Sequence, residues 1–397
     1  MKKVLATVLA LVMALALCSV SWATESELPT EENGVIKLTG NVTLTARWEV
    51  AADKEITLDL NGYSITSAGQ VIMNNGKLTI TDNKGGGKIV STGSQAIGVG
   101  SNSVTNIQKA IVESVEGAVI TGYATGATIN IYDGTFSASD NAVIAGNGKS
   151  REGTGNTINI SGGVFNGKIT TPGYVACGIY APWKDNINVT GGTFNITGGA
   201  GIVARAGNVT VTNAVFNTTG NATGKVGDSR VVVPCSAIVF DSQANYPAMN
   251  NDSVIHVVSG KFNSEMNAVS MIKNDNETDR VAVTGGTFST DVKEYLAEGK
   301  ILQKNGDTYT AVTNSGITSG TYTSEPTVPS GYKATKNDDG TWTVSKVSYY
   351  YYQPTTDTKT TDTKGSPKTF DAGIALYVGM ALTSAAGVAF VGKKRED

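Results

Sequence analysis

Histidine, cysteine and blocks of like charge are scarce in this chain of 397 residues. His256 is its one histidine, and Cys177 and Cys235 are the cysteines that remain once a leader-like N-terminus is set aside. Two cysteines do not make a disulfide framework. The formal net charge is −3 and no basic block occurs, which makes nucleic acid a poor partner. The apolar segments show no helical period, so a helical bundle is not expected.

The first 23 residues predict a secretory signal peptide. Two lysines precede an uncharged apolar run at residues 4–17, and small residues stand at a cleavage site that ends with Ala23. A lipoprotein anchor at Cys18 is the alternative, although Leu17 stands where such a signal has a small residue. Residues 1–23 are therefore left out of the fold, and the mature chain is expected to be secreted.

The C-terminal residues 366–397 contain, in order, a short motif, an uncharged span at 372–392 and a basic tail. About 20 apolar residues can cross a bilayer, and the basic tail would stay in the cytoplasm. This arrangement resembles the wall-sorting signal of Gram-positive surface proteins, whose motif is Leu-Pro-any-Thr-Gly. The residues that match this motif are Pro367, Lys368 and Thr369.

The resemblance implies that a sortase cleaves after Thr369 and joins the chain to peptidoglycan. Ser366 and Phe370 depart from the Leu and Gly of the family motif, so a plain membrane anchor through the apolar span is the alternative. Both interpretations hold the protein on the extracellular face of a Gram-positive-type bacterium. The low-complexity residues 348–365 are expected to form a solvated spacer.

A repeated motif that ends in phenylalanine fills the middle of the chain. Successive phenylalanines are 29, 29, 22, 46 and 26 residues apart, which is a solenoid period. The residues seven and five positions before each phenylalanine are Ile or Val, the pattern of a strand with one buried face. The doubled interval predicts either insertions or one degenerate coil. The six motifs end at Phe136, Phe165, Phe194, Phe216, Phe262 and Phe288.

A second, shorter strand follows the motif in most copies, as in "CGIYAP" at 177–182 and "AGIVAR" at 200–205. Two or three short strands per coil predict an all-β parallel β-helix, a solenoid in which stacked coils share one core. Cys177 and Cys235 then lie two coils apart, about 9–10 Å at the usual strand spacing. That distance is too long for a disulfide between them.

Alternating strands also precede the phenylalanine motifs, at residues 40–45, 54–66 and 76–83. With these strands, residues 34–312 resemble the pectin-lyase-like right-handed β-helices of bacterial surface proteins. The resemblance implies a right-handed parallel β-helix as the main domain.

The chain changes character after the last motif. Residues 291–299 predict a short helix, and residues 300–312 predict a hairpin. Residues 313–347 contain a diverged copy of the motif and the hairpin. We expect them to form a small β-rich cap that closes the last coil.

Enzymes of the resembled fold cleave acidic polysaccharides, and their catalytic patterns find little match here. The hydrolases need clustered aspartates, whereas the one Asp-Asp pair, Asp338-Asp339, lies in the expected cap. The lyases need carboxylates that hold calcium and a basic residue. The possible members of such a group are Asp185, Asp241, Asp275 and Arg205.

Equivalent positions in neighbouring coils favour a different role for two of these residues. Arg205 and Asp241 each follow the second strand of a coil, so we expect an ion pair between them. His256 falls in an outward column with Asn130 and Asn159, where a solvated side chain is expected. That polar column is either ordinary strand surface or a ladder of hydrogen-bonding groups for a glycan.

The loops after the second strands are the expected ligand-binding surface, because function concentrates on loops held by a rigid scaffold. Tyr180, Trp183 and Tyr246 offer ring faces that stack on sugars, with Arg205 and Asp241 beside them. The alternative is that Trp183 and Tyr246 cover the edges of coils.

The sequence therefore predicts a surface-anchored, adhesin-like protein that presents a β-helix to glycans or to a host or neighbouring cell surface, without catalysis. No cofactor or metal is expected. Two alternatives remain open: a surface-tethered calcium-dependent polysaccharide lyase, and a purely structural coat component.

Overall fold

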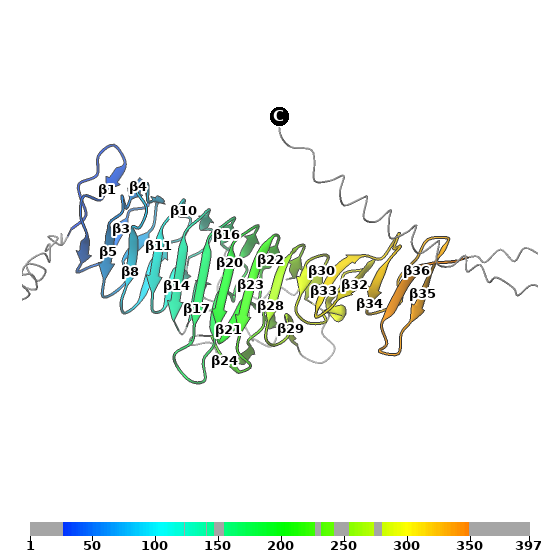
Figure 1. The fold of residues 1–397 in the computed structure, drawn as a ribbon. Helices are drawn as coiled ribbons and strands as arrows, with labels where there is room; N and C mark the ends of the chain where they lie inside the picture. Colours follow the sequence, from blue (N-terminus) through cyan, green and yellow to red (C-terminus); the bar gives the residue numbers. More distant parts are fainter. Residues whose placement is uncertain are drawn as a thin grey trace, which may run out of the picture. The chain divides into compact units, whose positions relative to one another are not determined.

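Three parallel β-sheets run side by side along the described part of the chain. The structure is a computed structural model that describes residues 27–122, 124–139, 141–146, 155–226, 232–241, 254–273 and 280–348. Successive strands pass from the first sheet to the second and then to the third, and each strand pairs in parallel with its counterpart one coil away. The result is a right-handed parallel β-helix, as predicted (Figure 1).

The three sheets are named I, II and III in the order in which the chain visits them. Sheet I consists of β1 (Val35–Lys37), β4 (Glu55–Asp59), β7 (Lys77–Thr81), β10 (Val104–Ile107), β13 (Thr128–Ile131), β16 (Thr157–Ile160), β19 (Asn186–Val189), β22 (Asn208–Val211), β27 (Ile255–Val257) and β30 (Val281–Val283). The parallel strands of sheet II are β2 (Val42–Leu44), β5 (Ser64–Ser67), β8 (Lys88–Ser91), β11 (Ile111–Ser114), β14 (Thr135–Ser139), β17 (Val164–Lys168), β20 (Thr193–Thr197), β23 (Ala214–Thr219), β28 (Gly260–Ser264) and β31 (Thr287–Phe288). Sheet III consists of β3 (Trp48–Val50), β6 (Ile72–Asn74), β9 (Gln95–Val99), β12 (Gly117–Gly122), β15 (Ala142–Gly146), β18 (Ala176–Ala181), β21 (Gly199–Ala204), β26 (Ile238–Asp241) and β29 (Val269–Ile272).

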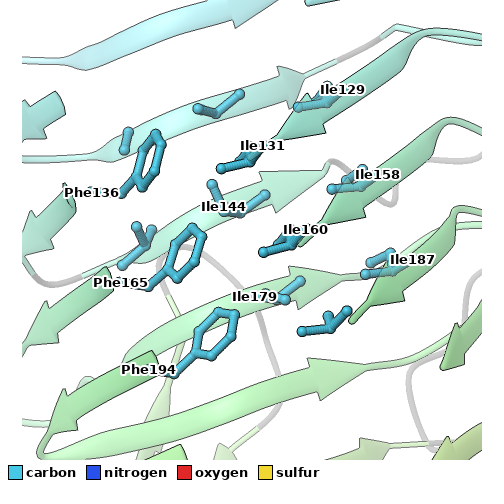
Figure 2. Packing of buried hydrophobic residues seen from close by; sticks show 14 of the residues in the cluster. Ile129, Ile131, Phe136, Ile144, Ile158, Ile160, Phe165, Ile179, Ile187 and Phe194 are labelled. Carbon is cyan, nitrogen blue, oxygen red and sulfur yellow. The ribbon is translucent and has the colours of Figure 1, made fainter. Parts of the chain in front are cut away.

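The six motif phenylalanines stack in one column inside the solenoid. Each is fully buried, and the ring centroids of neighbours lie 4.5–5.4 Å apart, with interplanar angles of 9–11°. This spacing follows the distance between adjacent strands, since each phenylalanine is in register with the next. Figure 2 shows Phe136, Phe165 and Phe194 in one row, with isoleucines of the other two sheets facing the same interior.

The glycine two residues before the phenylalanine explains the turn that the motif repeats. Gly134, Gly163, Gly192, Gly260 and Gly286 all have φ between 95° and 136°, where a side chain is strained. At Gly192, an added Cβ would also lie 3.2 Å from the carbonyl oxygen of Gly163 in the coil before it. The motif at Phe216 has Ala214 at this position instead, and there Asn213 takes the positive φ, at 57°.

The doubled interval between Phe216 and Phe262 is an insertion within one coil. β23 pairs directly with β28, and the two phenylalanines are in register with each other. The extra residues include an antiparallel hairpin of β24 (Thr223–Lys225) and β25 (Val232–Pro234). The other possibility raised by the sequence, a degenerate coil between them, is therefore wrong.

A second apolar cluster lies on the outer face of sheet III, where the hairpin β24–β25 packs. Its buried residues include Val203, Val239 and Val233, together with Cys177 and Cys235. Both cysteines are free thiols, as predicted; Cys177 lies on β18, and Cys235 directly follows β25. Burial raises the pKa of the Cys177 thiol to about 12.

Antiparallel strands follow the last coil and continue sheet II. β33 (Thr308–Thr313) pairs with β31 and with β32 (Lys300–Asn305), and the sheet ends in the order β34 (Gly320–Tyr322), β36 (Trp342–Lys346), β35 (Tyr332–Lys336). The short helix expected at 291–299 is only a 3-10 turn, η1 (Lys293–Tyr295). The main chain of Lys293 donates a hydrogen bond to Asp291 Oδ1 at its start, 2.8 Å.

The expected signal peptide, spacer, sorting motif and membrane span lie outside the described residues, apart from Ser348 at the start of the spacer. Within the described residues, no helix is long and apolar enough to cross a membrane.

Candidate functional site

Three of the predicted ligand-binding residues meet on the outer face of sheet III. Tyr180 lies on β18, Arg205 directly follows β21, and Asp241 ends β26. Alternation along these strands turns the three side chains outward, away from the phenylalanine column. Arg205 Nε lies 3.0 Å from Asp241 Oδ2, and Arg205 Cζ lies 5.4 Å from the centre of the Tyr180 ring. The predicted ion pair between neighbouring coils is confirmed.

This ion pair is covered rather than presented to solvent. The side chains of Arg205 and Asp241 are 1% and 0% exposed. Burial removes the hydration of both charges, and the pairing of Arg205 with Asp241 offsets part of that cost, as does the position of the Arg205 guanidinium over the Tyr180 ring. A calcium-dependent lyase built on Asp241 and Arg205 would need both groups to reach a substrate, and neither group is accessible in this arrangement.

Trp183 is also buried, with 2% of its surface exposed. Its ring faces are therefore not available to a ligand. The residue lies in the turn between β18 and β19. Its indole Nε1 has no hydrogen-bond partner among the described residues. Tyr246 and Asp275 lie outside the described residues.

Asp185 is a buried carboxylate at the turn that leads from sheet III to sheet I. Its Oδ1 accepts hydrogen bonds from the main-chain nitrogen of Asn156 (2.8 Å) and from Asn156 Nδ2 (3.0 Å). Burial raises the pKa of Asp185, and it outweighs the two hydrogen bonds, which act in the opposite direction. The carboxylate thus organises the coil corner and does not face solvent, since the residue is 1% exposed.

The raised pKa gives a prediction about pH. The folded protein holds a proton on Asp185 more tightly than the unfolded chain does, so stability decreases as pH rises from the ordinary aspartate pKa through the raised value. An Asp185→Asn variant keeps an oxygen acceptor for Asn156 and carries no charge. We expect its stability relative to the native protein to be greater near pH 7 than near pH 4, by urea denaturation at both. The exposed Asp53 supplies the control variant, Asp53→Asn. A stability difference for Asp185→Asn that is the same at both pH values would contradict the prediction.

Hydrogen-bonded asparagines run along the outer face of sheet I. The Nδ2 atoms of Asn130, Asn159 and Asn188 each donate to the Oδ1 of the asparagine one coil earlier, at 2.8, 2.8 and 2.9 Å. His256 lies in the same register and is exposed, as predicted. The column therefore consists of outward-facing polar side chains, and hydrogen bonds between coils hold its asparagines in place.

A second asparagine ladder lies on the outer face of sheet II. Asn195, Asn217 and Asn263 donate to Asn166, Asn195 and Asn217, at 3.2, 2.9 and 2.9 Å. The ladder stops at β14, because the next residue in register is Ser137. The asparagine column thus ends at a serine, whose side chain is smaller.

A groove of about 480 Å³ opens at this step in side-chain size. It crosses β11, β14, β17 and β20, and it is lined by Glu113, Ser114, Ser137, Ala138, Ser139, Asn166, Gly167, Lys168, Asn195 and Thr197. Glu113 lies at one side, where Lys88 Nζ donates a hydrogen bond to its Oε1 at 3.0 Å. Lys168 is exposed and forms no ion pair with another described residue.

Sequence reasoning missed this groove because it concentrated on loops and aromatic residues. The usable signal was the register of the motifs. The residue after the phenylalanine is asparagine in the four middle motifs and serine in the first and last, so the column steps down in size at Ser137. Among the described residues, no group of three or more His, Cys, Asp or Glu side chains could hold a metal ion.

The chain was compared with protein families, curated proteins and solved structures. No family model, no curated protein and no solved structure matches this chain.

Proposed function

We propose that this chain is a cell-surface-anchored, adhesin-like protein that binds glycans along the outer face of sheet II and does not cleave them. The observation that supports the proposal is the groove between β11 and β20, which has the volume of a small-ligand site. The partner would be a glycan of a host or neighbouring cell.

The anchoring part of the proposal rests on the sequence of residues 366–397, with sortase, peptidoglycan and the membrane as the implied partners.

The chemistry of the groove suits a polyhydroxylated ligand. Serine and threonine hydroxyls and asparagine amides both donate and accept hydrogen bonds, as sugar hydroxyls do. Asn195 is held between Asn166 and Asn217 by its own hydrogen bonds. A side chain that is already ordered loses less entropy when a ligand binds.

The groove would take a polymer across the strands, since its lining residues come from four successive coils. Adjacent strands are about 4.8 Å apart, which is close to the length of one sugar ring. Neighbouring coils can therefore contact neighbouring sugar units of a polysaccharide. A surface of this kind binds extended ligands with scattered hydrogen bonds and needs no titratable pair.

The test fills the groove with one bulky side chain. Ser137 faces outward at the middle of the groove, so we expect Ser137→Phe to weaken binding of a retained glycan by about tenfold or more. The matched control is Ser161→Phe, which adds the same ring at an exposed serine that follows β16 of sheet I. Binding to an immobilised panel of host and plant glycans is the measurement. Equal retention of the two variants would remove the groove from the proposal.

A further inference from the structure

A second groove, on a different face of the solenoid, carries an inference of its own. It has a volume of about 410 Å³ and lies on the outer face of sheet III, over β6, β9 and β12. We propose that this groove binds the acetamido group of an N-acetylated sugar, with Gln70 Nε2 as the donor to the acetamido carbonyl.

Two glycines make the floor of the groove low. On β9, Ile97 and Val99 are part of the buried core, and Gly98 takes the alternate, outward position; Gly100 directly follows the strand and also lines the groove. Gly98 is in register with Met73 on one side and Ile120 on the other. A Cβ on Gly98 would overlap the Gln70 amide, and one on Gly100 would overlap Asn75 Oδ1. The missing side chains are what leaves room for these two amides.

The orientation of the Gln70 amide follows from its neighbour Arg47. Arg47 Nη1 donates a hydrogen bond to Gln70 Oε1 at 3.2 Å, so the oxygen of the amide must face the guanidinium. Gln70 Nε2 therefore faces Gly98. This nitrogen is covered, and no described residue offers it a hydrogen-bond acceptor. A covered donor without an acceptor is unfavourable, and a ligand carbonyl would remove the defect.

Access to this donor would come from movement of Met73. A Cβ on Gly98 would lie 3.0 Å from Met73 Sδ, which places the thioether beside the Gln70 amide. A methionine side chain has three rotatable bonds and adapts its shape at small cost. Rotation of Met73 away from Gly98 would open a path to Nε2 and would let the thioether pack against the methyl group of an acetamido substituent.

The charges around the groove favour a neutral acceptor over a carboxylate. Arg47 is the cation nearest to Gln70, and Glu49 already neutralises it: Nη2 lies 2.6 Å from Glu49 Oε1, and Nε donates to the same oxygen at 2.7 Å. An anionic ligand would meet both members of this pair. An uncharged amide carbonyl would meet only the Gln70 donor.

The remaining lining identifies the rest of the ligand as a sugar. Gln95 and Ser101 line the groove with Asn75, and their amides and hydroxyl can pair with ligand hydroxyls. Ile120 and Met73 supply an apolar patch beside the donor. A hydrogen-bond acceptor that carries a methyl group and is surrounded by hydroxyls is the pattern of an N-acetylated hexosamine. This site shares no lining residue with the groove on sheet II.

Calorimetric titration of the full mature protein with three probes tests the inference. The probes are N-acetylglucosamine oligomers, the same oligomers after deacetylation, and glucose oligomers of the same linkage. We expect the acetylated oligomers to bind at least about tenfold more tightly than either of the others. Absence of binding by the acetylated probe, or equal binding of all three probes, would overturn the proposal.

Two variants assign the effect to Gln70. Gln70→Met removes the donor and Gln70→Glu replaces it with an acceptor, so each should weaken binding of the acetylated oligomers about tenfold. Gln70→Met should leave the melting temperature nearly unchanged, because the covered donor has no partner among the described residues and the hydrogen bond that Arg47 loses is exposed to solvent. The control is Gln108→Met, at an exposed position after β10. Full affinity in Gln70→Met would refute the role of Gln70. Ser137→Phe should leave this binding unchanged, so the two grooves succeed or fail separately.

Discussion

Phe194→Ala is expected to lower the free energy of unfolding by about 3–5 kcal/mol. The ring is fully buried and stacks on Phe165 at 4.5 Å and on Phe216 at 4.6 Å, so its removal opens a cavity between two other rings. The neighbours cannot close that cavity easily, because their backbone positions are fixed by strand pairing on both sides. Urea denaturation of the native protein and the variant gives the difference.

Phe194→Leu and Lys184→Ala are the comparison variants for this experiment. Leucine refills part of the cavity, so its loss of stability should be smaller than that of alanine. Lys184 is exposed in the same coil, and its replacement should change stability by less than about 0.5 kcal/mol. A loss below about 1 kcal/mol for Phe194→Ala would contradict a core built on the phenylalanine column.

Asp241→Ala is expected to have a similarly large effect, a loss of about 3–5 kcal/mol, because it leaves the charge of Arg205 buried without its carboxylate. Replacing both partners, in Arg205→Met with Asp241→Leu, removes the charges together and should recover most of that loss. The double variant separates a structural ion pair from a functional one, since a pair that only stabilises the fold can be exchanged for apolar groups. Thermal unfolding of the two variants is the measurement.

The exposed pair Lys77–Glu55 provides the control for the buried pair. Its side chains are 48% and 72% exposed, and Glu55→Ala should cost less than about 1 kcal/mol. If Asp241→Ala proved as mild as Glu55→Ala, the Arg205 charge would have to be compensated by other groups, and the view of this pair as a coupled unit would be wrong.

The repeat was readable from the sequence because each coil uses the same physical solution. Two β-branched residues at a period of two, a turn with positive φ and a phenylalanine predicted the buried column that runs from Phe136 to Phe288. The free cysteines and the ion pair between Arg205 and Asp241 followed from the same alignment of coils. These features depend on register, which a regular repeat determines.

The strand pattern could not predict which side chains on the outer faces of the sheets are buried. The hairpin β24–β25 packs on the outside of sheet III, and nothing in the strand pattern shows which outward side chains it covers. The sequence suggested that Trp183 is a loop residue with an accessible ring, yet it is buried. Both grooves arise from steps in side-chain size between coils, at Ser137 and at Gly98, which are properties of neighbouring coils rather than of one motif.

The measurement that tests the central claim most directly is incubation of the protein with the panel of host and plant glycans, with retention and bond cleavage scored on the same samples. The claim of binding without turnover predicts that at least one glycan is retained and that no new reducing or unsaturated ends appear, with or without calcium. Release of unsaturated sugars that requires calcium would contradict it, and it would make the lyase the function of this chain.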